Sequence, residues 1–309
     1  MAMRTWGAGA LLREAFTLPS LVALLVKDEG LDCNRFPAQE QSWEHWIAIE
    51  CQRRTKFAAY CFFNLQCIAF DLPPLILTSE VRLSLPYSAE QWKAESAEAW
   101  LETRRKSPPS EVLFQEALAN LFAKSNLVRP ISSYGNYILI SALIQQIFFI
   151  RQTSVLIPWK VIGHGLDPQD IDELGHALRT WQASWEASNE SSLDPSNPNG
   201  SVAFSSTALL RLGYMRLHSD LGPCRKLDSQ DPVGIAAALM ESPALSRSPQ
   251  LTRAVLQSAH ALSIPVKLGI EYVARTQTLS WSIQHSLCNL ECAFLLSKTC
   301  NLRIQVSSG

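Results

Sequence analysis

The sequence predicts an all-α protein. Apolar residues recur at helical spacing through most of the chain, and proline pairs and capping residues mark the ends of these segments. The alternating pattern of a strand appears only at residues 75–83, where we expect a short extended segment. Because 309 residues can form one large core and nothing in the sequence forces a division, residues 1–309 are predicted to form one domain.

The first long helix is predicted to begin near Trp43. Its apolar face comprises Trp43, Trp46, Ile47, Phe57, Cys61, Leu65 and Ile68. Phe62 and Phe63 make the opposite side of the second half apolar as well, so this half is expected to lie centrally in the protein. Asp71 and the pair Pro73-Pro74 are expected to end the helix.

Further helix starts are predicted from capping signals. Ser88 with Gln91 forms a capping box, and Pro108-Pro109-Ser110 is expected to open another helix. Asp167-Pro168 supplies an N-cap and a proline at the first helical position. The apolar seam that follows is Ile171, Leu174, Leu178, Trp181 and Trp185. His176 lies on the opposite side of this helix and is expected to face solvent.

The C-terminal third contains one polar stretch and several apolar ones. Residues 188–203 are rich in Pro, Gly, Asn and Ser and predict a surface loop. Helices are expected at 206–218, near 232–241 and after Ser248-Pro249, with a long apolar segment from about 264 to 299.

Two segments resemble membrane or export signals. Residues 131–150 are strongly apolar, but Asn136 and Gln145-Gln146 favour a buried helix over a lipid-facing one. The N-terminal apolar run is interrupted by Arg13 and Glu14, which argues against a signal peptide. We therefore expect no membrane contact.

The charge balance argues against DNA binding by this chain itself. Its net charge is −1 with 18% charged residues, whereas phosphate neutralisation needs a basic excess. The small basic clusters at residues 53–56 and 104–106 are equally typical of charged helix faces. The eight cysteines are scattered through apolar segments, which indicates reduced, buried thiols.

Glu50 and Arg54 are the candidate site residues. They stand four apart on the stripe that carries the tryptophans, where opposite charges can pair. One interpretation is a ligand clamp or an allosteric relay. The other, which we favour because unpaired buried charge is rare, is an internal structural ion pair that fixes the register of the helix.

No metal site is predicted. His285, Cys288 and Cys292 share one helix, but tetrahedral zinc cannot gather three ligands spread over two turns of a single helix, so packing thiols are favoured. Neither a C2H2 nor a C-x2-C-x6-C zinc-finger spacing occurs. We expect no cofactor in this chain.

No catalytic constellation is predicted either. Asp167, Asp170, Asp172 and Glu173 raise the alternative of an all-α isoprenoid-type enzyme that binds Mg²⁺ and a diphosphate. Their spacing does not match paired metal ligands, and acidic residues are common in a first helical turn. The chain is therefore predicted not to be an enzyme.

Several blocks resemble one protein family, in the same order along the chain. They are residues 42–109 with their tryptophans, Ser133-Tyr134-Gly135-Asn136, residues 177–188, residues 204–223 and residues 265–298. Together they resemble the regulatory middle-homology domain of fungal-specific transcription factors, in the variety joined to C2H2 zinc fingers.

The resemblance implies a regulatory module of a nuclear transcription factor. It implies partners among the transcriptional machinery or co-regulator proteins and allows a small-molecule effector. Binding of DNA and of zinc is expected only in zinc fingers, which this chain lacks. The sequence starts inside the family pattern, so we expect an N-terminally truncated domain with some exposed apolar surface. The alternative is a finger-less interaction protein that competes for the partners of related factors.

Overall fold

The structure is a computed structural model. It describes residues 10–32, 42–106, 111–123, 131–155, 166–194, 201–219, 221, 227–229, 231–242, 249–269, 271–273, 275 and 282–307. The helices are α2 (Ala10–Asp28), α3 (Trp43–Phe70), α4 (Ala89–Trp92), α5 (Ala97–Lys106), α6 (Phe114–Phe122), α7 (Ser133–Val155), α8 (Pro168–Glu186), α9 (Ser201–His218), α10 (Pro232–Glu241), α11 (Pro249–Leu268) and α13 (Ile283–Ser307), with the 3-10 turns η1 (Thr78–Glu80) and η3 (Leu227–Ser229). Within these ranges there is no strand, and the all-α prediction is confirmed.

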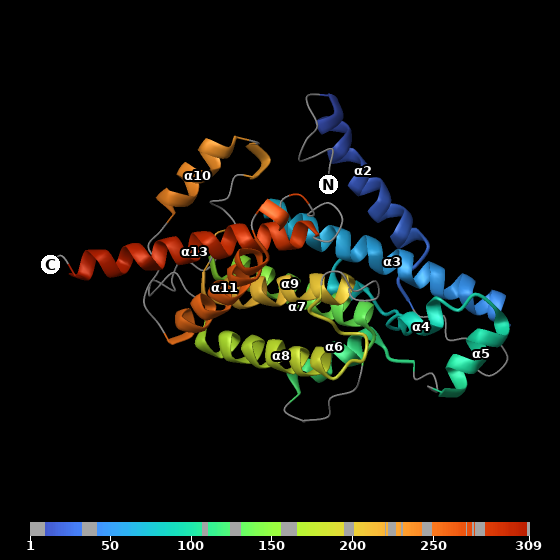
Figure 1. Ribbon diagram of the computed structural model, residues 1–309. Helices are drawn as coiled ribbons and strands as arrows, with labels where there is room; N and C mark the ends of the chain where they lie inside the picture. Colours follow the sequence, from blue (N-terminus) through green and yellow to red (C-terminus); the bar gives the residue numbers. More distant parts are fainter. Residues whose placement is uncertain are drawn as a thin grey trace.

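Two helices, α7 and α9, form the centre of the molecule. They pack against each other; α3, α6 and α8 contact α7, while α8, α11 and α13 contact α9 (Figure 1). Ile138, Leu139 and Ile140 are all fully buried. Because consecutive helical residues point about 100° apart, α7 is covered on all sides here. The stretch Ser133–Thr153 is long and apolar enough to cross a membrane, but 72% of it is buried, which confirms the predicted buried helix.

Helix α3 begins and ends where local signals predict. The Ser42 hydroxyl accepts the His45 N–H at 3.3 Å, and Asp71 caps the C-terminus in the left-handed conformation with φ 55°. Tyr60, Phe63 and Ile68 in its second half are almost completely buried. The predicted central position of this half is confirmed.

The extended segment predicted at residues 75–83 is not a regular strand. It is interrupted by η1, and the described residues form isolated bridges, Asp32 with Arg82 and Ser84 with Leu113. A buried side chain of α7 replaces the missing strand partner. The Gln145 amide oxygen accepts the Thr78 N–H at 2.7 Å, and its nitrogen donates to the Ile76 carbonyl at 3.1 Å. A polar residue in the apolar helix thus satisfies backbone groups that would otherwise be buried unpaired.

Helix α6 begins at Phe114, later than the predicted start at Pro108-Pro109-Ser110, a position outside the described residues. The reason is a backbone pairing. The Leu85 N–H donates to the Val112 carbonyl at 2.8 Å, and the Phe114 N–H donates to the Leu83 carbonyl at 3.0 Å. This pairing holds the chain extended up to the first residue of the helix.

Two predicted boundaries in the C-terminal part need correction. Helix α9 begins at Ser201, inside the loop predicted at 188–203, of which residues 195–200 lie outside the described part. The apolar segment 264–299 is divided, because α11 ends at Leu268 before Gly269, whose φ is 91°. The helix near 232–241, the start at Pro249 and the Asp167-Pro168 start are confirmed.

His176 does not face solvent as predicted. It is half-buried, and its Nε2 lies 3.1 Å from the Ala123 carbonyl oxygen. The helical pattern could not indicate this, because α6 packs against α8 and its C-cap residue Ala123 contacts His176.

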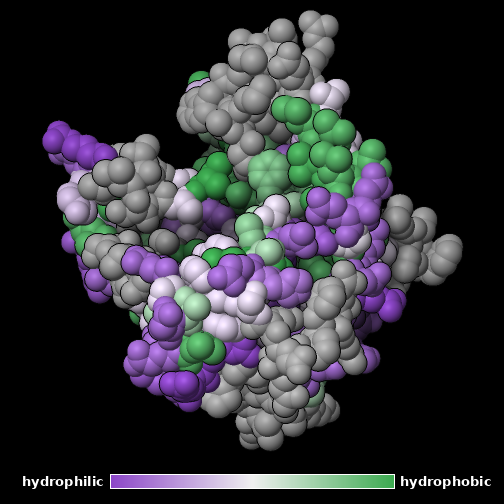
Figure 2. All heavy atoms as spheres, turned by 90° about the vertical axis from the view of Figure 1, so that its right-hand side faces the viewer, coloured by the Kyte–Doolittle hydropathy of each residue, from purple (hydrophilic) through white to green (hydrophobic). Residues whose placement is uncertain are grey.

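Exposed apolar side chains gather on α2. They are Leu18 (47% exposed), Leu21 (52%), Val22 (38%), Leu24 (56%) and Leu25 (56%), and we call them the α2 apolar face. Figure 2 shows a green group of this kind in the upper part of the molecule. Ala23, on the inner side of the same helix, belongs to the core and holds α2 against the body.

A buried histidine, His285, and a half-buried one, His218, make stability dependent on pH. Burial and the charge of Arg211 lower the pKa of His285 to about 3, and His285 stacks on Phe204 with ring centroids 4.1 Å apart. Burial and the charges of Arg151 and Arg253 lower the pKa of His218 to about 4. Both imidazoles are therefore neutral in the folded protein at pH 5 to 7.

We predict that stability falls as the pH decreases from about 6.5. The unfolded chain protonates His285 and His218 near pH 6.5 and the folded chain keeps both neutral, so each contributes a slope approaching roughly 1.4 kcal/mol per pH unit below that point. Urea unfolding at pH 7, 6 and 5 measures this dependence. His285→Phe should remove about half of this slope, because His218 keeps its share, whereas His260→Gln, at an exposed position, should leave it unchanged. An equally steep dependence in His285→Phe would contradict the assignment.

Candidate functional site

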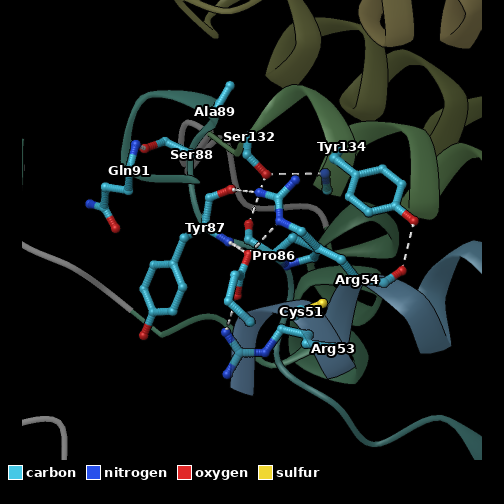
Figure 3. Close-up of polar contacts among 12 residues, drawn as sticks. Cys51, Arg53, Arg54, Pro86, Tyr87, Ser88, Ala89, Gln91, Ser132 and Tyr134 are labelled. Atoms are coloured by element: carbon cyan, nitrogen blue, oxygen red, sulfur yellow. Dashed lines mark hydrogen bonds and ion pairs between the residues drawn. The ribbon is translucent and has the colours of Figure 1, made fainter. Parts of the chain in front are cut away.

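A fully buried carboxylate, that of Glu50 on α3, is the centre of the candidate site. Figure 3 shows its partners Arg53, Arg54 and Tyr87. Its Oε1 accepts the Arg54 Nε–H at 2.8 Å and the backbone N–H of Tyr87 at 3.0 Å. Its Oε2 accepts the Arg53 Nη1–H at 2.7 Å. Both oxygens are thus occupied by charge-assisted or backbone hydrogen bonds, which compensates the cost of burying the charge.

Arg54 joins α3 to three other segments. Its Nη2 donates to the Tyr87 carbonyl at 2.8 Å, and its guanidinium lies 4.6 Å from the Trp92 ring centroid and 5.6 Å from that of Tyr134. The Tyr134 hydroxyl donates to the Arg54 carbonyl at 3.2 Å. The aromatic rings shield the ion pair from water, and a desolvated cation over a ring is worth up to roughly 2 kcal/mol.

Arg53 extends the cluster towards a second carboxylate. Its Nη2 lies 3.3 Å from Glu111 Oε1, which also accepts the Ser84 hydroxyl at 2.8 Å. Its guanidinium stands 5.2 Å from the Tyr87 ring centroid. Two carboxylates therefore face two guanidinium groups, and the cluster as a whole carries no net charge.

The electrostatics of this cluster favour a structural role. Burial, and to a lesser extent the Glu111 charge, raises the pKa of Tyr87, and burial raises that of Tyr134. Both phenols therefore stay protonated at physiological pH and cannot act as bases. The arrangement can fix the position of α3 against the 81–88 segment, α4 and α7.

The Glu190 carboxylate links the start of α4 to the start of α7. Its two oxygens accept the Ala89 N–H and the Ser133 N–H, each at 2.7 Å. These two amides belong to the first turns of α4 and α7, where a negative charge is favourable. The sequence suggested only a polar loop here, because neither helix start is close to Glu190 along the chain.

The structure brings Glu50 and Arg54, the two predicted site residues, into direct contact. Arg53 also bonds to the Glu50 carboxylate. It is the i,i+3 neighbour of Glu50, so the spacing in the sequence could have revealed it. Tyr87, Glu111 and the other partners come from distant segments and carry no comparable signal. The basic cluster at 53–56 is therefore no phosphate-binding patch, since both arginines point inward.

A second buried ion pair lies between α9 and α13. Arg216 Nη2 donates to Glu291 Oε1 at 2.6 Å and to the Ile68 carbonyl of α3 at 2.9 Å. Burial opposes the charge of Arg216, but Glu291 outweighs it and raises the pKa of the guanidinium. The Arg216 carbonyl accepts a hydrogen bond from Arg151 of α7. This pair thus connects α3, α7, α9 and α13.

The acidic residues near residue 170 do not form a metal site. Asp167 caps α8 through the Gln169 N–H at 2.9 Å, and Asp172 and Glu173 are exposed. No group of three or more His, Cys, Asp or Glu residues that could hold a metal ion occurs in the part of the chain that the structure describes. The isoprenoid-enzyme alternative receives no support from this geometry.

Comparison with models of known protein families shows to which family the chain belongs. The model of the fungal specific transcription factor domain matches residues 19–183, more than half of the chain. The chain belongs to this family. The family model of the fungal transcription factor C-terminal domain matches residues 220–301. No curated protein and no solved structure matches the chain.

The family assignment confirms the resemblance found in the sequence and supports a role in transcription regulation. The match extends from α2 to α8 and includes Glu50, Arg53, Arg54, Tyr87 and Glu111. Fungal transcription factor domains are generally not enzymes, in keeping with a cluster that is neutral and internally bonded. Arg216 lies between the two matched regions, and its partner Glu291 lies in the second.

Proposed function

We propose that this chain is the regulatory module of a nuclear fungal transcription factor and that it acts by binding co-regulator proteins or the transcriptional machinery. The match over residues 19–183 is the observation that carries the proposal. DNA would be read by C2H2 zinc fingers outside residues 1–309, because the cysteines and histidines of this chain lack finger spacing and its net charge is −1.

The charge and surface of the described residues support binding of proteins rather than of nucleic acid. The arginines of the first basic cluster are used internally, whereas the α2 apolar face is exposed. Contiguous exposed apolar patches are typical of protein–protein contact sites. We also propose that residues 1–309 work as one domain, because α9 lies between the two matched regions and packs against helices of both.

Fusion to an unrelated DNA-binding domain tests this function. Residues 1–309 joined to such a domain should change transcription of a reporter several-fold in a fungal host. The double variant Leu21→Asp/Leu25→Asp, on the α2 apolar face, should reduce this effect while the helical content stays the same.

Leu256→Asp is the matched control, because Leu256 is 65% exposed on another helix, α11. It should leave the reporter unchanged relative to the parent fusion. A folded fusion without effect on the reporter would contradict the proposed regulatory role. Loss of the effect in Leu256→Asp as well would contradict the assignment of the contact to α2.

A further inference from the structure

Three sulfur atoms meet where α9, α11 and α13 come together. Cys288 and Cys292 stand four apart on α13, and their Sγ atoms are 3.8 Å apart. Met215 of α9 places its Sδ 3.4 Å from Cys292 Sγ. All three side chains are at most 2% exposed. The sequence argued against tetrahedral zinc because one helix cannot supply enough ligands. In the structure a different helix, α9, supplies the third sulfur.

We propose that Cys288, Cys292 and Met215 form a binding site for a soft monovalent cation of the Cu(I) type. Soft thiolate and thioether ligands favour Cu(I). Zinc in proteins is usually bound by four ligands in a tetrahedron, drawn from cysteine, histidine and carboxylate side chains and not from methionine. Three sulfurs bound in a plane at about 2.3 Å from one ion lie about 4.0 Å apart. Cys292 Sγ lies 3.8 Å from Cys288 Sγ and 3.4 Å from Met215 Sδ, close to this spacing.

The charge around the sulfurs suits such an ion. Two thiolates and one monovalent cation carry one negative charge together, and the buried guanidinium of Arg211 lies close enough to act on both thiols. Binding releases the two thiol protons to solvent and forms two copper–thiolate bonds without any change of oxidation state. The charges of the two thiolates, the cation and the Arg211 guanidinium then sum to zero, which reduces the cost of burying them.

A neighbouring contact positions the third ligand. The Ser258 hydroxyl of α11 lies 3.1 Å from Met215 Sδ and also donates to the Ala254 carbonyl at 2.8 Å. The hydroxyl thus contacts the thioether from the side of α11. An ion bound here would link α9 to α13 directly, next to the Arg216–Glu291 pair. The proposal concerns binding alone and does not depend on the transcriptional role.

A competition titration under reducing, oxygen-free conditions tests the site. The folded 309-residue protein is equilibrated with Cu(I) and a chromophoric Cu(I) chelator. It should retain one equivalent, with a copper–thiolate absorption in the ultraviolet. Cys288→Ser and Cys292→Ser should each weaken binding at least about 100-fold, and Met215→Leu, which keeps the side-chain volume, about 10-fold. X-ray absorption should count three sulfur neighbours in the parent protein and two in Met215→Leu.

Cys51→Ser is the matched control, because Cys51 is an exposed thiol on α3. It should bind as tightly as the parent protein, and circular dichroism should show the same helical content in all variants. Unchanged affinity in Cys292→Ser would overturn the proposal. Loss of the bound equivalent in Cys51→Ser, or its displacement by an equal concentration of Zn²⁺, would do the same.

Discussion

Glu50→Gln should lower the free energy of unfolding by about 3–5 kcal/mol, because it removes the buried charge that the Arg53 and Arg54 guanidinium groups share. Arg53 and Arg54, whose side chains are only 10% and 17% exposed, would then face a neutral amide. A domain is stable by only about 5–15 kcal/mol, so this single change removes a large share of the total. Chemical denaturation followed by circular dichroism measures the loss.

Glu102→Gln is the control for this experiment. It makes the same substitution in another i,i+4 ion pair, with Lys106, whose side chains are 65% and 64% exposed. Its unfolding midpoint should match that of the parent protein, since exposed pairs are screened by solvent. A midpoint for Glu50→Gln that coincides with the parent would mean that the carboxylate does not stabilise the fold.

The same variants separate the two interpretations of the Glu50–Arg54 pair. If the pair is structural, the coupling free energy between Glu50→Gln and Arg54→Met in a double-mutant cycle should reach about 0.5–3 kcal/mol. The reporter effect of the fusion should then fall only in proportion to the folded fraction. A ligand clamp would instead abolish the reporter effect in a variant that is still folded.

Arg216→Met should also cost about 3–5 kcal/mol of unfolding free energy, because the buried Glu291 carboxylate would lose the Arg216 guanidinium. The Ile68 carbonyl of α3 would lose the hydrogen bond from Arg216 at the same time. We expect the loss to be largest in the C-terminal helices. Hydrogen exchange should show lower protection in α13 than in the parent protein, with a smaller change at the start of α3.

The double variant Arg216→Met/Glu291→Leu should recover much of this loss, since apolar residues of similar volume often replace a buried ion pair without penalty. Arg275→Met is the control, because Arg275 and its partner Glu271 are 77% and 80% exposed. If the double variant is no more stable than the single one, the Arg216–Glu291 contact is not what stabilises this junction.

The local features of this protein could be predicted from its sequence. The start of α8 at Asp167-Pro168, the end of α3 at Asp71 and the buried state of residues 131–150 all depend on residues within a few positions of each other. Caps, prolines and the 3.6-residue period act over one or two turns, so the chain carries these signals directly. Glu50 and Arg54 were found for the same reason.

Contacts between helices needed the fold. Glu291 lies 75 residues from Arg216 and Met215 lies 77 from Cys292, and no pattern in the chain links either pair. His176 was placed wrongly because its exposure depends on whether another helix covers that side of α8. Helical periodicity predicts which face of a helix is apolar. It cannot predict which helix packs there, because that depends on how all the faces bury one another at once.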